Sequence, residues 1–338
     1  MESENNYHAF HTRLKKIPSG TRNKNSKLTY DEVVEIKNSL ILGHPEFGTR
    51  PLAKKYGVDH KVIMDIYHNR KYQEVKIPYT FFVSSDIHSA YTPWIKALKE
   101  AGFNENKYAH KLITCGDLFD RKDESIEVLQ FVMRMVEKDK IILVKGNHDL
   151  LLEELCIRGF PYSYDKSNGT VKTVQDISGK HSLQEFQEAC DTTYNKLSHY
   201  RELLVNYFET KNYIFVHSWI PTLVESEGKM KPWYQEGKIY HYREDWRNAT
   251  EGEWEEAMWG NPYDMAKQDL NKTGKTIVFG HFHTSYQWAK DGKCSEFGAD
   301  AIFESYYGKN YIGIDSAVAY TNKINVIVLE DEIIDGSY

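Results

Sequence analysis

The chain has no long hydrophobic run. Its longest, such as the four residues 141–144, are far shorter than the roughly 20 apolar residues that cross a bilayer. The amino terminus begins Met1-Glu2-Ser3-Glu4 and lacks the apolar core of a signal peptide. We therefore expect a cytoplasmic protein without membrane association.

Cysteine is scarce and scattered. The four cysteines, Cys115, Cys156, Cys190 and Cys294, form no C-x-x-C pair. This spacing argues against a disulfide framework and against a structural zinc site, and it suits a reducing compartment.

Charge is unevenly spread over an otherwise ordinary globular composition of 41% hydrophobic and 27% charged residues. Residues 1–75 contain 13 Lys and Arg and 9 Asp and Glu, a balance of +4. The whole chain has −6, which leaves −10 for residues 76–338. This split either reflects two different tasks or is ordinary variation, and charge alone does not decide between them.

The front of the chain predicts a small helical domain. Residues 1–27 are polar with six basic side chains and suggest a flexible basic arm. Within residues 28–75, Thr29 and Glu32 form a capping box for a helix that runs to about Ile41. Thr49 is expected to cap a helix over 50–56, and Gly57 and Asp59 then separate it from a helix over 61–67.

Two short helices joined at a glycine suggest a helix-turn-helix, and residues 50–63 resemble the DNA-binding motif of phage and bacterial regulators. In that reading His60, Lys61 and Met64 face the bases. Phosphate contacts would come from Lys54, Lys55, Arg70 and Lys71. The alternative is a module that docks on protein.

After a linker at 73–78, strands and helices alternate, which predicts an α/β layered domain over 76–338. The expected strands are 80–84, 111–115, 141–145, 213–217, 276–279, 311–314 and 323–329, and the expected helices are 91–102, 124–137 and 150–158. Two insertions interrupt the pattern at about 159–212 and 222–275. An amphipathic stripe from Leu183 to Phe208 predicts one long helix in the first, and both insertions could wall a cleft.

Side chains of the types that bind metal ions lie at the ends of five of the expected strands. The sequence blocks are Ser85-Asp-Ile-His88, Gly116-Asp-Leu-Phe-Asp-Arg121, Gly146-Asn-His-Asp149, Val216-His-Ser218 and Gly280-His-Phe-His283. Each block alone is a weak or moderate signal, but their order in one chain is specific. Two divalent ions at such a site can clamp a phosphoryl group, and Asp117, in the central block, is the natural bridge between them.

These blocks resemble the calcineurin-like metallophosphoesterases, and within them the phosphoprotein phosphatase family, which includes phage protein phosphatases and symmetrical diadenosine tetraphosphatases. The resemblance runs from about Tyr79 to Glu330 and includes Met258-Trp-Gly-Asn-Pro and Ile312-Gly-Ile-Asp-Ser-Ala-Val-Ala-Tyr. It implies a β-sandwich flanked by helices and two divalent ions, with Mn²⁺ favoured and Fe, Zn, Ni or Co as alternatives.

The resemblance also implies roles for residues. Asp86, His88, Asp117 and His283 would bind one metal, and Asp117, Asn147, His217 and His281 the other. His148 would be the general acid, Asp120 the carboxylate that orients it, and Arg121 a phosphate ligand.

Several positions depart from the family pattern. Ser85, Ser89 and Lys122 stand where glycine is usual. Asp149 stands where many protein phosphatases have Glu, and an Asp at this position makes the block more similar to that of the dinucleotide hydrolases. The fourth block reads Val-His-Ser-Trp in place of Val-His-Ala-Gly. A second phosphate-binding arginine has three candidates: Arg158, Arg243 and Arg247.

The sequence therefore predicts a phosphoesterase in which metal-bound hydroxide attacks phosphorus directly. Phosphorylated Ser, Thr or Tyr on protein is the first substrate hypothesis, and a dinucleoside polyphosphate is the nearest rival. Further alternatives are a DNA-processing phosphodiesterase or phosphatase, brought to duplex DNA by residues 28–75, and a DNA-binding regulator without activity.

Overall fold

The computed structural model describes residues 28–225 and 239–334, so the predicted basic arm at 1–27 lies outside the described residues. The described chain forms two compact units. Unit 1 contains residues 28–80, 104–110 and 330–332, and unit 2 contains 81–103, 111–329 and 333–334. The predicted boundary at residue 76 stays a prediction, since short segments from later in the chain belong to unit 1.

The α/β fold expected from the alternating pattern is present as two five-stranded sheets. The first has the order β12-β1-β2-β3-β4, in which β2, β3 and β4 run parallel. Its strands are β1 (Tyr79–Ser84), β2 (His110–Cys115), β3 (Ile141–Val144), β4 (Leu204–Val205) and β12 (Ile327–Asp331). All six residues of β2 are buried, as expected of an inner strand whose two faces are both covered.

The second sheet has the order β10-β11-β9-β6-β5, with β6, β9 and β11 parallel and the outer strands antiparallel. Its strands are β5 (Phe208–Glu209), β6 (Tyr213–Phe215), β9 (Thr276–Phe279), β10 (Tyr306–Tyr307) and β11 (Tyr311–Gly313). The Phe81 ring on β1 meets those of Phe208 and Phe215 at centroid distances of 6.1 and 6.3 Å. The two sheets therefore pack face to face through aromatic side chains.

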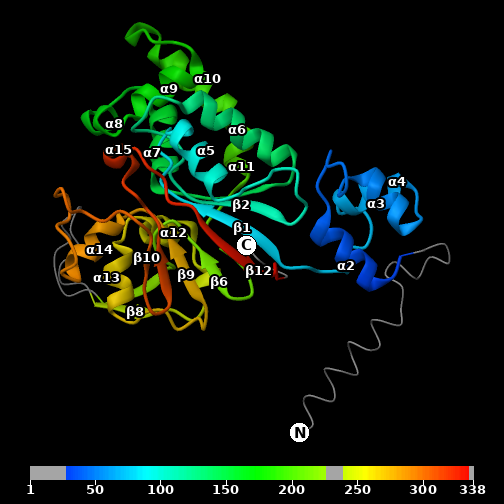
Figure 1. Cartoon of the computed structure of the whole chain (residues 1–338). Helices are drawn as coiled ribbons and strands as arrows, with labels where there is room; N and C mark the ends of the chain where they lie inside the picture. Colours follow the sequence, from blue (N-terminus) through cyan, green and yellow to red (C-terminus); the bar gives the residue numbers. More distant parts are fainter. Residues whose placement is uncertain (1–27, 226–238, 335–338) are drawn as a thin grey trace. The chain divides into compact units, whose positions relative to one another are not determined.

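Helices cover the outer faces of this sandwich (Figure 1). On the first sheet lie α5 (Tyr91–Glu100) and α6 (Ser125–Glu137), whose buried Trp94, Leu98 and Phe131 join the largest apolar cluster. The second sheet is covered by α12 (Glu251–Met258), α13 (Pro262–Lys267) and α14 (Thr284–Lys290). α15 (Val318–Thr321) follows β11. The predicted β-sandwich flanked by helices is confirmed.

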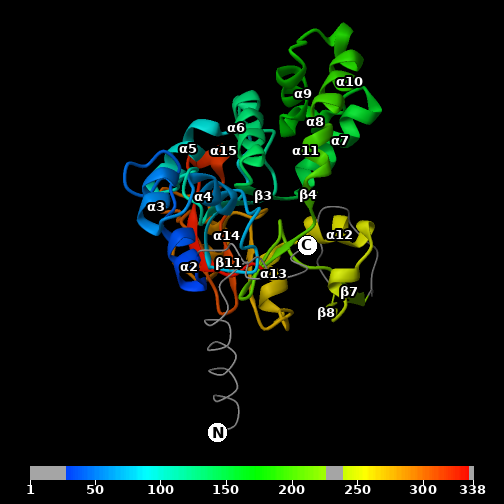
Figure 2. The ribbon, with the colours of Figure 1, turned by 90° about the vertical axis from the view of Figure 1, so that its right-hand side faces the viewer.

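The first insertion is a helical group beside α7 (Asn147–Arg158), which Figure 2 shows from the side. It consists of α8 (Ser163–Asn168), α9 (Thr170–Ser178), η1 (Leu183–Glu185), α10 (Phe186–Lys196) and α11 (Ser198–Glu202). The prediction of one long helix to Phe208 was wrong. The chain turns at Leu197, and Leu204 and Phe208 belong to strands β4 and β5.

The second insertion carries the hairpin β7 (Thr222–Glu225) and β8 (Ile239–Tyr242), then η2 (Trp246–Asn248), α12 and α13. Residues 226–238, between the two hairpin strands, are outside the described part. Among the described residues, no helix combines the length and the apolar character that a membrane span requires.

Unit 1 contains α2 (Tyr30–Ser39), α3 (Thr49–Tyr56) and α4 (His60–Tyr67). The capping box of Thr29 and Glu32 and the Asp59 cap form as predicted. Thr49 is not a cap but the first helical residue, because Gly48 occupies the N-cap position. Gly57 ends α3 in the left-handed conformation. These helices bury a separate apolar core that includes Val33, Ile36, Leu52, Ile63 and Ile66.

Candidate dinuclear metal site

The predicted ligand blocks all follow strands of unit 2, at the ends where the strands lead into turns or helices. Asp86 follows β1, Asp117 follows β2, and Asn147 begins α7 after β3. Asn147, His148 and Asp149 were expected before a helix starting at residue 150, but they form its first turn, so the His148 N–H at this helix N-terminus reaches Asp117.

Left-handed backbone conformations concentrate at these blocks. The φ angles are 51° at Asp86, 47° at His88, 54° at Asp117 and 63° at His281. Residues with side chains adopt this region rarely, and each instance costs of order 1–3 kcal/mol. Such a cluster persists only where the surrounding fold overdetermines it, which is typical of functional sites.

The glycine of the third block permits a close approach between two loops. A Cβ atom on Gly146 would lie 2.2 Å from Asp117 Oδ1. Any side chain there would push Asp117 away from the neighbouring block. The glycine is therefore part of the geometry that brings Asp117 next to Asn147 and His148.

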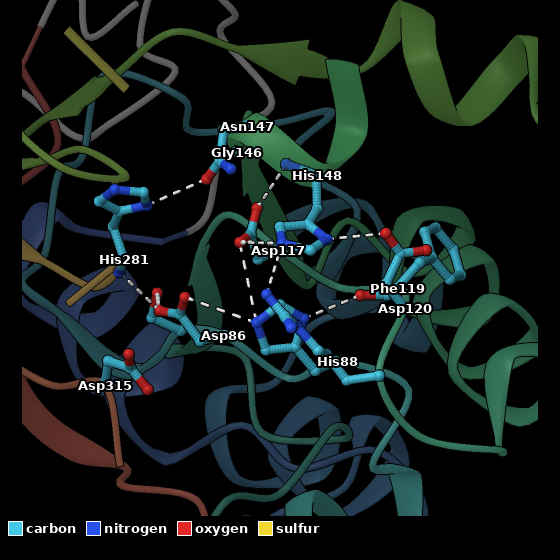
Figure 3. Close-up of polar contacts among 12 residues, drawn as sticks. Asp86, His88, Asp117, Phe119, Asp120, Gly146, Asn147, His148, His281 and Asp315 are labelled. Carbon is cyan, nitrogen blue, oxygen red and sulfur yellow. Dashed lines mark hydrogen bonds and ion pairs between the residues drawn. The ribbon is translucent and has the colours of Figure 1, made fainter. Parts of the chain in front are cut away.

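Asp117 lies at the centre of the cluster (Figure 3). Its Oδ1 is 3.5 Å from His217 Nε2 and its Oδ2 is 3.8 Å from His88 Nε2. Its Oδ1 also accepts the backbone N–H of His148 at 3.0 Å. Burial alone raises the pKa of Asp117, but the imidazoles of His217, His148 and His88 lower it further than burial raises it, so the carboxylate stays ionised.

Three neutral side chains, those of Asn147, His217 and His281, converge beside the Asp117 carboxylate. Asn147 Oδ1 lies 2.7 Å from His217 Nε2 and 3.0 Å from His281 Nδ1. Two groups of side chains thus share Asp117: one contains His88 and His148, and the other contains His217 and His281. This is the arrangement that a carboxylate bridge between two cations requires.

The histidine tautomers fit metal binding. His88 Nδ1 lies 3.0 Å from the Phe119 carbonyl and His217 Nδ1 lies 2.9 Å from the Cys115 carbonyl. A carbonyl accepts only, so each Nδ1 carries the proton and each Nε2 keeps a lone pair directed towards Asp117. Burial lowers the pKa of His88 to about 4, so its ring is neutral, as a ligand must be. The residues present therefore fit divalent cations.

Asp86 is at the edge of this cluster. Its Oδ2 accepts the His281 N–H at 2.8 Å and the Ser85 hydroxyl at 2.5 Å, while Oδ1 lies 3.9 Å from His88 Nε2. Ser85, a departure from the usual glycine, thus anchors a predicted ligand. Burial, followed by the charges of Asp315 and Asp117, raises the pKa of Asp86.

His283 is placed differently from the other predicted ligands. It is the N-cap of α14, where its Nδ1 accepts the Tyr286 N–H at 3.2 Å, and its Nε2 lies 3.3 Å from Glu296. It lines the same cavity but, like Asp86, is in neither of the two groups that share Asp117. The buried Asp315, which sequence reasoning did not single out, lies beside Asp86 in Figure 3.

The predicted acid and its carboxylate partner are in contact. His148 Nδ1 lies 2.7 Å from Asp120 Oδ2, and both side chains are buried. Arg121 extends one guanidinium nitrogen to 3.4 Å from His148 Nε2. Burial lowers the pKa of His148, but the carboxylates of Asp117 and Asp120 outweigh it, so the net pKa is raised. A raised pKa favours a protonated imidazole, which is the form that donates a proton.

Asp149, which stands where many protein phosphatases have Glu, holds the turn that carries Asn147. Its Oδ2 accepts the Gly146 N–H at 2.8 Å and its Oδ1 accepts the Tyr200 hydroxyl at 2.7 Å. Tyr200 comes from the first insertion, 51 positions away, and no sequence signal connects the two.

None of the three candidates for a second phosphate-binding arginine has a free guanidinium. Arg158 is paired with Asp165 at 2.5 Å, Arg243 with Asp245 and Glu253, and Arg247 with Glu209 at 2.6 Å. Arg121 is the one arginine among the described residues that line the cavity.

The cavity over this site has a volume of about 1140 Å³. Its wall is largely apolar and draws on the second insertion through Leu223, Tyr240 and Trp259. Phe297 and Tyr320 lie on the wall near His283; their rings are 5.7 Å apart, and both remain more than half exposed. Glu253 and Glu256 add acidic groups.

In unit 1 the residues predicted to contact DNA divide into two sets. Lys54, His60 and Lys61 are exposed, and Met64 is half-buried. Lys55 pairs with Glu35 at 2.6 Å, and Arg70 and Lys71 both lie 3.1 Å from Asp65. Since three of the cations already have carboxylate partners, the positive surface is smaller than the sequence suggests.

The β-sandwich and its set of ligand side chains together define a class of protein, the metal-dependent enzymes that hydrolyse phosphoesters. The family model described as calcineurin-like phosphoesterase (Metallophos) matches residues 79–328. The chain belongs to the calcineurin-like phosphoesterase family, and the expected family is confirmed.

Characterised relatives share shorter stretches. The chain is 37% identical over 73 residues to a symmetrical bis(5'-nucleosyl)-tetraphosphatase of Buchnera aphidicola subsp. Acyrthosiphon pisum (strain Tuc7), covering 22% of this chain and 25% of that protein. It is 26% identical over 140 residues to the symmetrical enzyme of Marinomonas sp. (strain MWYL1), covering 41% and 44%. The chain thus spans less than half the length of these relatives.

Among solved structures, one similar to this chain is a Saccharomyces cerevisiae protein serine/threonine phosphatase with similarity to human PP5. The alignment covers 76% of this chain and 81% of the phosphatase chain. The identity is 14% and the TM-score 0.44.

Proposed function

We propose that the chain is a phosphoesterase that uses two divalent metal ions. The observation that carries this proposal is that two groups of side chains able to bind a cation, one with His88 and His148 and one with His217 and His281, share Asp117. One metal would be held by Asp86, His88 and Asp117, and the other by Asp117, Asn147, His217 and His281. Bound there, the cations would supply positive charge opposite the phosphoryl oxygens and acidify a water molecule.

The metal identity follows from the donor set. Carboxylate and amide oxygens suit Mg²⁺ and Mn²⁺, whereas imidazoles suit Zn²⁺, Fe²⁺, Ni²⁺ and Co²⁺. A mixed set of the kind found here accommodates Mn²⁺, which we propose as the first choice, with the others as alternatives. The predicted ligand role of His283 stays a proposal: its Nδ1 caps α14 and its Nε2 lies 3.3 Å from Glu296, apart from the side chains named above.

The chain's own side chains complete the reaction. His148 would donate a proton to the leaving oxygen, and Asp120 would keep the proton on Nδ1 and the ring in place. Arg121, whose guanidinium lies beside His148 Nε2, would bind the phosphoryl oxygens and hold the leaving oxygen near the acid.

The substrate that the cavity favours is a phosphomonoester on protein Ser, Thr or Tyr. Arg121 is the one arginine among the described wall residues; of the two wall glutamates, Glu253 is paired with Arg243, and Glu256 adds negative charge. A polyphosphate chain would place several further anions along this wall, whereas a single phosphoryl group needs only Arg121 and the metals. The two named relatives are tetraphosphatases, so a dinucleoside polyphosphate remains the rival substrate.

A substrate panel tests this choice. The full chain with Mn²⁺ is assayed for kcat/KM on phosphoserine, phosphothreonine and phosphotyrosine peptides, on diadenosine tetraphosphate, and on nicked and single-stranded DNA. The proposal expects a phosphopeptide to have the highest value. A higher kcat/KM for diadenosine tetraphosphate or for DNA would contradict the proposed substrate while leaving the metal site standing.

We further propose that unit 1 binds duplex DNA. The supporting observation is that Lys54, His60 and Lys61 are exposed on two capped helices that pack together on either side of Gly57. The DNA-processing alternative would need both units, and a regulator without activity would need only this one.

A further inference from the structure

The Asp120 carboxylate has two donors besides His148. Thr170 Oγ1 donates to Asp120 Oδ2 at 2.7 Å, and Thr173 Oγ1 donates to Asp120 Oδ1 at 2.8 Å. Both hydroxyls are buried, as is the carboxylate. With His148 Nδ1 also 2.7 Å from Oδ2, each carboxylate oxygen is held by at least one donor, and the plane of the carboxylate is fixed.

Both threonines come from α9 in the first insertion. They are three positions apart and so share one face of the helix, which is why both reach the same carboxylate. The Asp120 N–H in turn bonds to the Thr173 hydroxyl at 3.1 Å, so backbone and side chain of Asp120 meet the same residue.

The start of α9 also contacts Arg121, the residue that follows Asp120 in the chain. The Arg121 N–H donates to the Asn168 carbonyl at 3.0 Å. Gly169 has φ +88°, and a Cβ there would lie 2.6 Å from the Arg121 nitrogen. Asp120 and Arg121 themselves are left-handed, with φ 76° and 64°, a conformation that these contacts help to hold.

We propose that Thr170 and Thr173 are positioning residues for the general acid, and that the first insertion is thereby a part of the catalytic machinery and not only a wall of the cleft. This inference rests on the proposed function. A freely rotating carboxylate would let the His148 ring turn away from the leaving oxygen. Two hydroxyls that lock the carboxylate aim the imidazole, as outer hydrogen-bond partners do for metal-bound histidines.

A purely structural role for these hydroxyls has a different signature. Removing a buried hydroxyl destabilises the fold and would lower activity on every substrate alike. Loss of positioning would slow only substrates whose leaving oxygen needs a proton. Thr193 provides the matched control, because its buried hydroxyl donates to the Val174 carbonyl at 3.0 Å, in the same helical group but without contact to Asp120.

The experiment compares Thr170→Val, Thr173→Val and Thr193→Val in the full chain with Mn²⁺, on phenyl phosphate and on p-nitrophenyl phosphate. For the first two variants we expect kcat on phenyl phosphate to fall about 10- to 100-fold and kcat on p-nitrophenyl phosphate to fall less than about threefold. Thr170→Ser should restore the phenyl phosphate rate. Thr193→Val should change both rates equally.

A second measurement is independent of turnover. The His148 Nδ1 proton, bonded to Asp120, should give a downfield NMR resonance that His148→Asn removes. That resonance should shift or broaden in Thr170→Val and stay unchanged in Thr193→Val. Equal losses on both phosphates, or an unchanged resonance in Thr170→Val, would overturn the proposal. If the unsubstituted chain hydrolyses neither phosphate, the proposed function fails, and the resonance still decides whether the threonines position His148.

Discussion

At the residue scale, the site depends on backbone conformation as much as on side-chain identity. The aspartate and histidine blocks could be predicted because each combines ligand types with a preceding strand. Asp315 lies within the block 312–320 that resembles the family, but the resemblance did not distinguish it from its neighbours. Thr170, Thr173 and Tyr200 could not be predicted, since their contacts join segments far apart in sequence. The one available signal was the three-residue spacing of the two threonines, and this spacing is too common on helices to single them out.

His283 shows how a sequence motif can leave the role of a residue open. The pattern Gly-His-x-His predicts two ligands, but the second histidine can serve equally well as a helix cap. In the structure it does so for α14, and Glu296 faces its other nitrogen. Which nitrogen of a histidine is free depends on the following helix and on neighbouring loops, and neither is encoded in the motif.

Replacing His148 by Asn should separate substrates by leaving group. Turnover of a phosphoserine peptide should fall roughly 10²–10⁴-fold, because a poor leaving group needs a proton in the transition state. Turnover of p-nitrophenyl phosphate should fall far less, and metal content should persist. His199→Asn, on an exposed imidazole of α11, is the control. Equal losses on both substrates would show that His148 is not the acid.

At the element scale, local signals located most helices and strands. Thr29, Glu32 and Asp59 cap as predicted, since caps depend on a few neighbouring residues. The first insertion was mispredicted because its apolar stripe continues across a helix end at Leu197 into the short strands β4 and β5. The periodicity of apolar residues indicates which side chains are buried, but it does not locate the residue at which a helix ends and a strand begins.

Unit 1 contains a buried lysine that makes its stability depend on pH. Lys37 Nζ donates to the Tyr72 and Val75 carbonyls at 2.9 and 2.7 Å. Burial lowers the pKa of Lys37 to about 8. The unfolded chain keeps this proton up to about pH 10.4, so it binds more protons than the folded chain between about 8 and 10.4. The contribution of Lys37 to stability should therefore rise with pH across this window.

Replacing Lys37 by Met should remove that rise and take the Lys37 donor away from the buried Val75 carbonyl, while the Tyr72 carbonyl still accepts the Val75 N–H at 3.2 Å. We expect a loss of about 1–3 kcal/mol in the local stability of α2 and α4, the cost of one buried group that loses its hydrogen-bond partner. Hydrogen exchange of these helices in the full chain, corrected for intrinsic rates at each pH, measures it. Lys54→Met, on an exposed lysine, is the control. Equal protection in both variants would contradict the role of Lys37.

At the scale of the whole molecule, the charge split suggested two tasks, and the structure assigns two compact units. The family match begins at residue 79, so the activity belongs with unit 2. Nothing in that match bears on unit 1, for which DNA binding stays a proposal. Pairing of Lys55, Arg70 and Lys71 with carboxylates could not be foreseen from charge counts, because it depends on tertiary contacts.

If unit 1 binds DNA, the full chain should retard mixed-sequence duplex at low salt in the micromolar range, since lysines release counterions from phosphates. Lys54→Ala with Lys61→Ala should lower the salt-dependence slope by about 2 and leave phosphatase activity unchanged. Lys96→Ala with Lys99→Ala, on exposed lysines of α5, should not change retardation. No retardation by the unsubstituted chain would favour a protein-docking module.

The central claim is that Asp117 bridges two cations, and metal content tests it most directly. The purified chain, saturated with Mn²⁺ and desalted, should carry about two ions, as a dinuclear site requires. Asp117→Asn should carry fewer than about one, with unchanged circular dichroism, because the charge shared by both ligand groups is gone. Asp31→Asn, on an exposed residue of α2, should retain the full content. About two ions in the Asp117→Asn variant, with normal turnover, would contradict the account.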